Sequence, residues 1–96
     1  MKITVNINRI KEFCGHRDIS YLGLFGSQVR GDSRRDSDLD VLIDFKETKS
    51  FFELARIQEA LEKIFNKKVD LVLKSNIKSS LKPYIFNDLT TIYEKR

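Results

Sequence analysis

This 96-residue chain contains few of the residues that mark disulfide-rich, metal-bound or linker-rich proteins. It has one cysteine, one proline, one histidine, four glycines and no tryptophan. A single cysteine, Cys14, excludes an internal disulfide framework and fits a reducing compartment, so we expect a cytoplasmic protein. The histidine, His16, lacks the partners in the sequence that a catalytic triad or a zinc site would need.

Long hydrophobic runs and low-complexity tracts are also missing. No apolar run approaches the roughly 20 residues of a membrane-spanning helix, and the polar residues within MKITVNINRIKEF argue against a signal peptide. No Ser/Gly-rich stretch divides the chain, so we expect one domain over residues 1–96. Hydrophobic residues make up 41% and charged residues 33%, a balance typical of a folded globular domain rather than of a disordered chain.

The charge balance is mildly basic. Lys and Arg number 18 against 14 Asp and Glu, which gives a formal net charge of +4 and permits an anionic ligand. The lysines between Lys63 and Lys82 are spread over three expected elements, and no nucleic-acid-binding motif accompanies them, so a solvated surface explains them best. We therefore do not expect direct nucleic-acid binding. The sequence leaves open whether the chain forms a homo-oligomer.

The hydrophobic pattern predicts helices that alternate with short strands. Apolar residues at helical spacing, a capping box of Ser50 with Glu53 and a terminator at Asn66 favour a central helix. Short apolar runs bounded by turn residues favour strands. The expected elements are a helix at 7–14 that Gly15 ends, a strand at 21–25, a helical turn and loop at 28–37, a strand at 39–45, a helix at 50–65, a strand at 68–73, a helix from about 81 to 88 and a short strand at 90–93. This order indicates an α/β (α+β) fold, a small mixed β-sheet with helices packed on it.

Several single residues carry expectations about packing. Cys14 lies on the apolar face of the first helix and is expected to pack in the core rather than to act as a nucleophile. Phe51 and Phe52 open the central helix and are most simply interpreted as core residues, with the alternative that one of them stays exposed for a partner. Pro83 fits only the first turn of the last helix, because a proline further inside would break it.

A turn after the first expected strand is suited to an anion. Gly26 and Ser27 directly follow the strand and open a helical turn, so backbone N–H groups and a hydroxyl can face a phosphate. Arg30, one helical turn later, adds a charge-assisted contact. The competing interpretation is an ordinary turn in which Ser27 caps a helix.

Two aspartates, Asp38 and Asp40, begin the next expected strand. Residues i and i+2 of a strand project from the same face, so the two carboxylates point together. Like charges at this spacing are unfavourable unless a cation lies between them, and hard oxygen ligands suit Mg²⁺ or Mn²⁺. The alternatives are a solvated strand edge, or a turn that Asp38 caps.

A third carboxylate is expected from one of two positions. Asp70 interrupts the apolar run VDLVL, where an uncompensated charge would be costly in a buried strand. It either faces solvent at a sheet edge or joins Asp38 and Asp40. Asp44 competes for the same role because it shares the face of Asp40, but it lies about 13 Å further along the strand, so we rank it below Asp70.

The stretch GSQVRGDSRRDSDLD combines these features in one motif: Gly-Ser, ten residues, then Asp-x-Asp. This pattern resembles the signature of the DNA polymerase beta-like nucleotidyltransferase superfamily. The internal Arg30-Gly31 and the run VLIDF after the acidic pair make the chain most similar to the minimal nucleotidyltransferase branch. The resemblance covers nearly the whole chain, from the first strand through KVDLV.

The resemblance implies a polymerase beta-like nucleotidyltransferase fold and a metal-dependent reaction. A nucleoside monophosphate, AMP from ATP, would pass to a hydroxyl, with Mg²⁺ or Mn²⁺ as the cofactor. Asp70 matches the third carboxylate of the family by strand context. The implied roles are catalysis and metal binding for Asp38, Asp40 and Asp70, and nucleotide binding for Gly26, Ser27 and Arg30.

Minimal nucleotidyltransferases of this kind often resemble antitoxins that act on small helical HEPN-domain toxins. Some of them adenylylate a tyrosine of that partner. The resemblance therefore implies a HEPN toxin as the protein partner and as the acceptor of AMP. The alternative is a non-catalytic antitoxin of the same fold, a binding module that neutralises its partner by contact.

Overall fold

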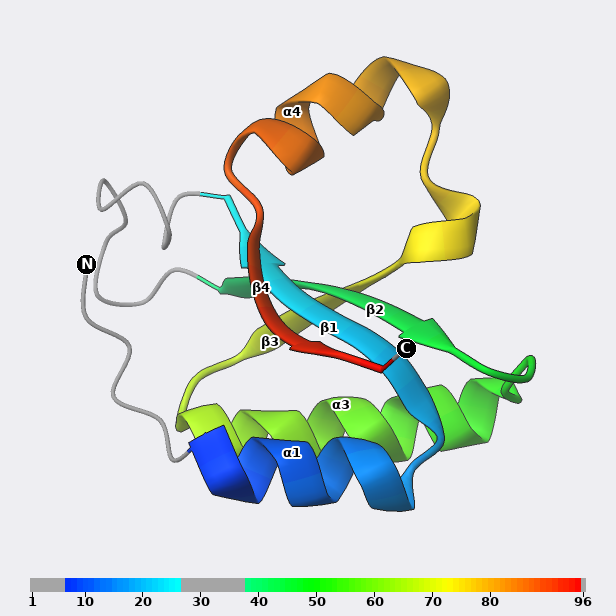
Figure 1. Cartoon of the computed structure of the whole chain (residues 1–96), viewed down its shortest axis with the longest axis vertical. Helices are drawn as coiled ribbons and strands as arrows, with labels where there is room; N and C mark the ends of the chain where they lie inside the picture. Colours follow the sequence, from blue (N-terminus) through cyan, green and yellow to red (C-terminus); the bar gives the residue numbers. More distant parts are fainter. Residues whose placement is uncertain (1–6, 27–37, 96) are drawn as a thin grey trace.

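The chain folds as a mixed four-stranded sheet with helical segments on both faces (Figure 1). The computed structural model describes residues 7–26 and 38–95. Its elements are α1 (Ile7–His16), β1 (Ile19–Phe25), β2 (Leu39–Phe45), α3 (Phe51–Phe65), β3 (Val69–Leu73), the 3₁₀ helices η1 (Lys74–Asn76) and η2 (Ser79–Leu81), α4 (Lys82–Asn87) and β4 (Thr90–Glu94). The predicted order of helices and strands is confirmed within these ranges.

The strand order in the sheet is β3-β2-β1-β4. β1 pairs antiparallel with both β2 and β4, whereas β2 pairs parallel with β3. A parallel pair cannot be joined by a tight hairpin, and α3 supplies the crossover between these two strands. The prediction of a mixed sheet is therefore confirmed.

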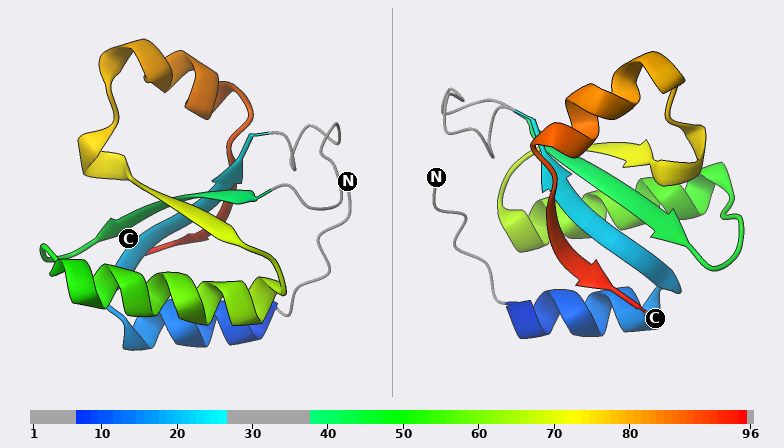
Figure 2. Two further views of the ribbon diagram at one scale, coloured as in Figure 1. Left: turned by 180° about the vertical axis from the view of Figure 1, so that it is seen from behind. Right: turned by 45° about the horizontal axis from the view of Figure 1, so that its top comes forward.

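Both faces of the sheet are covered, and this explains the consecutive apolar residues Val41, Leu42 and Ile43. Val41 and Ile43 belong to the core cluster under α1 and α3, which also contains Leu61. Leu42 points the other way and packs with Ile85 of α4. In Figure 2 the two long helices lie below the sheet, and the segment from η1 to α4 arches over the opposite face.

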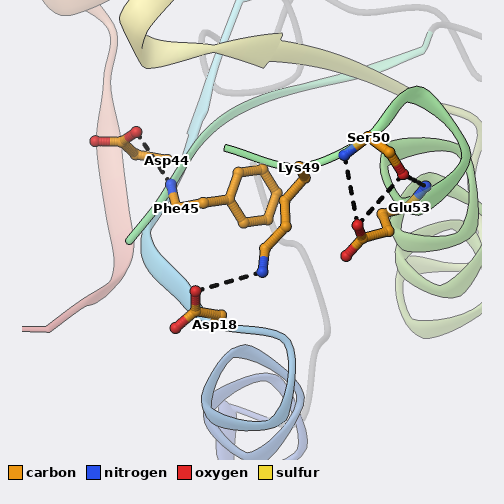
Figure 3. A network of polar contacts seen from close by, with 6 residues as sticks. All are labelled: Asp18, Asp44, Phe45, Lys49, Ser50 and Glu53. Atoms are coloured by element: carbon orange, nitrogen blue, oxygen red, sulfur yellow. Dashed lines mark hydrogen bonds and ion pairs between the residues drawn. The ribbon is translucent and has the colours of Figure 1, made fainter. Parts of the chain in front are cut away.

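The start of α3 forms as its sequence predicts. The backbone N–H of Glu53 donates to Ser50 Oγ at 3.2 Å, and the Glu53 carboxylate accepts from the Ser50 N–H (Figure 3). Asn66 ends the helix in the left-handed conformation with φ 55°. Beside this cap, Lys49 Nζ lies 3.3 Å from Asp18 Oδ2, so an ion pair joins the loop before α3 to the turn before β1.

The structure corrects the predicted end of the first helix. Gly15 lies inside α1, which continues to His16. The left-handed residue is Asp18, with φ 60°. Aspartate tolerates this conformation better than most residues, so the chain does not need glycine to leave the helix.

The prediction that Phe51 and Phe52 belong to the core is wrong. Their side chains are 81% and 77% exposed. The two rings pack edge to face on each other, with centroids 6.4 Å apart. They occupy the first turn of α3, whereas the buried part of the helix begins only at Ile57. Position on an apolar stripe therefore did not guarantee burial, because the sheet does not cover the first turn.

Side chains of α3 also bind the backbone of the edge strand β3. Gln58 Nε2 donates to the Val69 carbonyl at 3.0 Å. The Val69 N–H donates to Glu62 Oε2 at 2.9 Å. Both backbone polar groups of Val69 are satisfied by the helix that packs beside it, as burial of such groups requires.

Two further expectations about packing are confirmed. Cys14 is completely buried in the cluster under α1, and burial raises the pKa of its thiol to about 12. Pro83 lies in the first turn of α4. Within the described ranges, none of the helices has the length and apolar character needed to cross a membrane.

Candidate functional site

The candidate site lies where β1 ends and where β2 and β3 begin. Phe25 is the Cα partner of Asp40 across the antiparallel pair, and Asp40 is the Cα partner of Asp70 across the parallel pair. Neighbouring strands lie about 4.8 Å apart, and residues in register share a face. Asp40 and Asp70 therefore project side by side from the same face as Leu42, opposite to α1 and α3.

Gly26 closes one side of this site. It follows β1 directly, is buried and has φ +85°, a conformation that side-chain-bearing residues rarely adopt. A Cβ atom at this position would collide with the carboxylate of Asp40. A glycine is therefore needed at position 26, because the Asp40 carboxylate occupies the space that any side chain would take.

The structure places Asp40 and Asp70 next to each other on adjacent strands. Asp38 does not join them in a three-residue acidic cluster. Asp38 is exposed and immediately precedes β2. Over residues 7–26 and 38–95, no three His, Cys, Asp or Glu side chains stand together in a way that could hold a metal ion. The role of Asp38 as a metal ligand stays a prediction.

The donor chemistry of the Asp40–Asp70 pair fits a divalent cation. Two carboxylates on adjacent strands supply hard oxygen atoms, and a cation between them would relieve their mutual repulsion. Asp40 is half-buried and Asp70 is exposed, so the pair is open to solvent on one side. These two residues could therefore hold Mg²⁺ or Mn²⁺ as part of a larger ligand set.

Asp44, the competing third carboxylate, has a different environment. Its Oδ1 accepts a hydrogen bond from the Phe45 N–H at 3.0 Å (Figure 3). It lines a separate cavity together with Lys46 and Lys49. The strand register thus makes Asp70, and not Asp44, the neighbour of Asp40. Ser27 and Arg30, the other predicted phosphate contacts, lie outside the described residues.

A cavity of about 310 Å³ opens beside the acidic pair. That volume is at the lower end of the range for small-molecule sites, about 300 to 1,000 Å³. One end is acidic, the wall is mainly apolar, and a lysine, an asparagine and a tyrosine complete it. The lining residues are Phe25, Asp40, Asp70, Val72, Asn76, Ile77, Lys78, Leu81, Tyr84 and Ile85.

The sequence reasoning assigned no site role to three polar residues of this cavity, Asn76, Lys78 and Tyr84. It considered Tyr84, with Tyr93, as a residue that could be modified, but nothing in the sequence distinguished either from a packing residue. The three polar residues belong to η1, the link to η2, and α4, which together cover the face of the sheet that carries the acidic pair. No motif marks them. The only signal available was that they belong to the segment between β3, which contains Asp70, and β4.

The arrangement suits phosphate chemistry assisted by a cation. The acidic end can hold a cation that a polyphosphate shares, and the apolar wall can accept a base or another flat group. Cys14 takes no part, because it is buried under the opposite face and its raised pKa keeps the thiol protonated at neutral pH.

Comparisons with known proteins identify the family of this chain. The family described as polymerase beta nucleotidyltransferase matches residues 8–96. The protein adenylyltransferase MntA of Thermococcus cleftensis is 36% identical over 90 residues, which cover 94% of this chain and 88% of that protein.

Two solved structures share the fold. A toxin–antitoxin crystal structure with AMP-PNP superposes with a TM-score of 0.76 at 20% identity, covering 96% of this chain and 76% of that one. A tri-AMPylated Shewanella oneidensis HEPN toxin in complex with its MNT antitoxin gives a TM-score of 0.67 at 16% identity, covering 93% and 70%. The family match over nearly the whole chain, together with the Thermococcus relative, shows that the chain belongs to the polymerase beta nucleotidyltransferase family and is a nucleotidyltransferase domain.

Proposed function

We propose that this chain is a protein adenylyltransferase that acts as an antitoxin. It transfers AMP from ATP to a hydroxyl group of a HEPN-domain toxin, and the acceptor is a tyrosine. The name of the Thermococcus relative supports the activity. The AMP-PNP complex supports the nucleotide, and the AMPylated HEPN toxin bound to its antitoxin supports the partner.

The observation that carries this proposal is the in-register pair of Asp40 and Asp70 beside Gly26, with a cavity next to them. An acidic pair at the rim of an apolar cavity is what a metal-bound nucleoside triphosphate requires. Phosphates would lie at the acidic end, and the base and ribose would occupy the cavity. Lys78, at the cavity lining, adds a positive charge that favours the anionic substrate.

Each predicted site residue has a role in this reaction. Asp40 and Asp70, with Asp38, would hold Mg²⁺ or Mn²⁺. When bound, the cation neutralises phosphate charge and lowers the pKa of the acceptor hydroxyl. Gly26, with Ser27 and Arg30, holds the triphosphate through backbone N–H groups, a hydroxyl and a guanidinium.

The residues of the site then position the two reactants for a single substitution at the α-phosphorus of ATP. The acceptor oxygen forms a bond to the α-phosphorus of ATP while the bond to the bridging oxygen breaks and pyrophosphate leaves. The hydroxyl proton passes to Asp70 or to water. Orientation of the two reactants supplies much of the rate.

We also propose that one domain, residues 1–96, carries this function and that it works in the cytoplasm. The lone buried thiol of Cys14 supports the location, because a reducing compartment keeps such thiols unpaired.

The test uses ATP labelled at the α-phosphate, Mg²⁺ or Mn²⁺, and a purified HEPN-domain toxin. The wild-type chain should transfer label to a tyrosine of the toxin, and Asp40→Asn should not. Asp44→Asn is the matched control, since it removes a carboxylate from the same face of β2 but from a different cavity. Binding of the toxin without transfer of label under any metal or nucleotide would support the contact-only antitoxin instead.

A further inference from the structure

We infer that the chain also modifies itself, by transferring AMP to its own Tyr84. This inference rests on the proposed function, because it uses the same nucleotide and the same acidic pair. It adds an internal acceptor, a site of covalent modification on the nucleotidyltransferase itself.

Tyr84 brings a hydroxyl group to the lining of the cavity beside the acidic pair. Of the described residues that line the cavity beside Asp40 and Asp70, only Tyr84 bears a hydroxyl group. Its side chain is 54% exposed. The proposed reaction needs a hydroxyl beside a bound nucleotide, and Tyr84 shares one cavity lining with Asp40 and Asp70.

The other two tyrosines of the chain are held elsewhere. Tyr21 is buried, and its hydroxyl lies 2.8 Å from Thr91 Oγ1 in a hydrogen bond. The Lys74 ammonium covers its ring at 4.4 Å from the centroid. Tyr93 packs against the core cluster under α1 and α3, on the face of the sheet opposite to the acidic pair. Neither tyrosine lines the cavity.

The local structure fixes Tyr84 at this position. Ile85, the next residue, is buried against Phe25 and Leu42 and anchors α4 to the sheet. Leu81 lies three residues before Tyr84, so the two side chains share one side of this helical segment, and both line the cavity. Pro83 stiffens the turn between them. Tyr84 is therefore part of a helix anchored to the sheet and not of a free tail.

The proposed step balances without another reactant. Tyr84 Oη forms a bond to the α-phosphorus of ATP, and the bond between that phosphorus and the oxygen bridging to the β-phosphorus breaks. Pyrophosphate leaves with the electron pair of that bond. The phenolic proton passes to Asp70 or to water, and the product is a tyrosine–AMP phosphodiester.

The experiment incubates the purified chain alone with ATP labelled at the α-phosphate and Mg²⁺ or Mn²⁺. Mass spectrometry of the intact protein should show one added AMP, and peptide mapping should place it on Tyr84. Because Tyr84 lines the cavity of its own chain, the rate constant should not depend on protein concentration. Tyr84→Phe should lose the label, while Tyr93→Phe, the matched control, should keep it.

Two measurements separate failure of this inference from failure of the proposed function. The rise in melting temperature of the wild-type chain on adding ATP and Mg²⁺ reports nucleotide binding independently of any transfer, and Tyr93→Phe, altered on the opposite face of the sheet, should show the same rise. Label on the HEPN toxin with none on this chain, or label on any residue other than Tyr84, would overturn self-modification and leave the proposed function standing. If neither protein is labelled and ATP produces no rise in melting temperature, both proposals fail.

Discussion

Asp40 and Asp70 are Cα partners across the parallel β2–β3 pair, although the whole of α3 lies between them in the sequence. Their pairing is a consequence of the crossover, which returns the chain to the neighbouring strand in register. The acidic pair therefore exists only when the sheet is formed.

The first prediction concerns this pair. Replacing both Asp38 and Asp40 with Asn should reduce AMP transfer at least about 100-fold. The amides bind a divalent cation more weakly than carboxylates do, and without the cation the developing phosphate charge is not stabilised. The free energy of unfolding should stay equal or rise slightly, since like-charge repulsion is relieved. Label transfer and urea unfolding measure the two effects. Wild-type turnover in this variant would contradict the assignment of Asp38 and Asp40 as metal ligands.

The second prediction concerns Gly26. Gly26→Ala should destabilise the fold by about 1–3 kcal/mol, because φ +85° strains any side-chain-bearing residue and the new Cβ would collide with the Asp40 carboxylate. It should also weaken ATP binding, since Asp40 has to move. The matched control is Gly15→Ala, where a Cβ would meet nothing within 4 Å and helix α1 should gain about 0.5–1 kcal/mol. Equal effects of the two substitutions in urea unfolding would contradict this account.

The third prediction separates surface from core aromatics. Replacing Phe51 and Phe52 together with Ser should change the free energy of unfolding by less than about 1 kcal/mol, because both side chains are largely exposed. Leu61→Ala, at a fully buried position of the same helix, should cost about 2–5 kcal/mol. Thermal and urea unfolding of the variants provide the comparison. A large loss of stability in the double Phe variant would mean that these rings are covered in solution.

The fourth prediction concerns Cys14. Burial raises the pKa of its thiol to about 12 from 9.0, so at neutral pH a thiol-alkylating reagent should react only as fast as the protein opens. The folded state holds the proton more tightly than the unfolded state. The contribution of the protonated Cys14 thiol to the stability of the folded state is therefore complete below pH 9 and is lost as the pH rises through the range from 9 to about 12.

A comparison with Cys14→Ala isolates this effect from the lysines and tyrosines that titrate in the same range. Above pH 9 the free energy of unfolding of the wild type should fall relative to that of the variant, by up to about 1.4 kcal/mol per pH unit. Rapid alkylation of the native protein, or a difference independent of pH, would show that the thiol is accessible.

The parts of this molecule that the sequence predicts well depend on local chemistry. The capping box of Ser50 with Glu53 and the left-handed Asn66 define both ends of α3 within a few residues of each signal. Consecutive apolar residues in β2 predict a strand covered on both faces, and both clusters exist. The glycine at position 26 also has a local reason, its positive φ.

The parts that the sequence does not predict depend on how distant segments meet. Phe51 continues the apolar stripe of α3, yet whether the sheet extends far enough to cover it is not a property of the helix. The neighbour of Asp40 could be chosen only once the β2–β3 register was known. Tyr84 and Lys78 line the cavity together with Asp40 and Asp70, because the segment after β3 folds back over the face of the sheet opposite to α1 and α3 (Figure 1).

The contacts of Gln58 and Glu62 with Val69 have a consequence for association between molecules. An exposed strand edge is a template on which another chain can add a strand, and such addition leads to aggregation. At Val69 both backbone hydrogen-bonding groups are already bonded to side chains of α3. The helix therefore prevents another strand from pairing with this end of β3. A partner that docks here has to recognise side chains, since the sheet cannot continue from one molecule into the next through Val69.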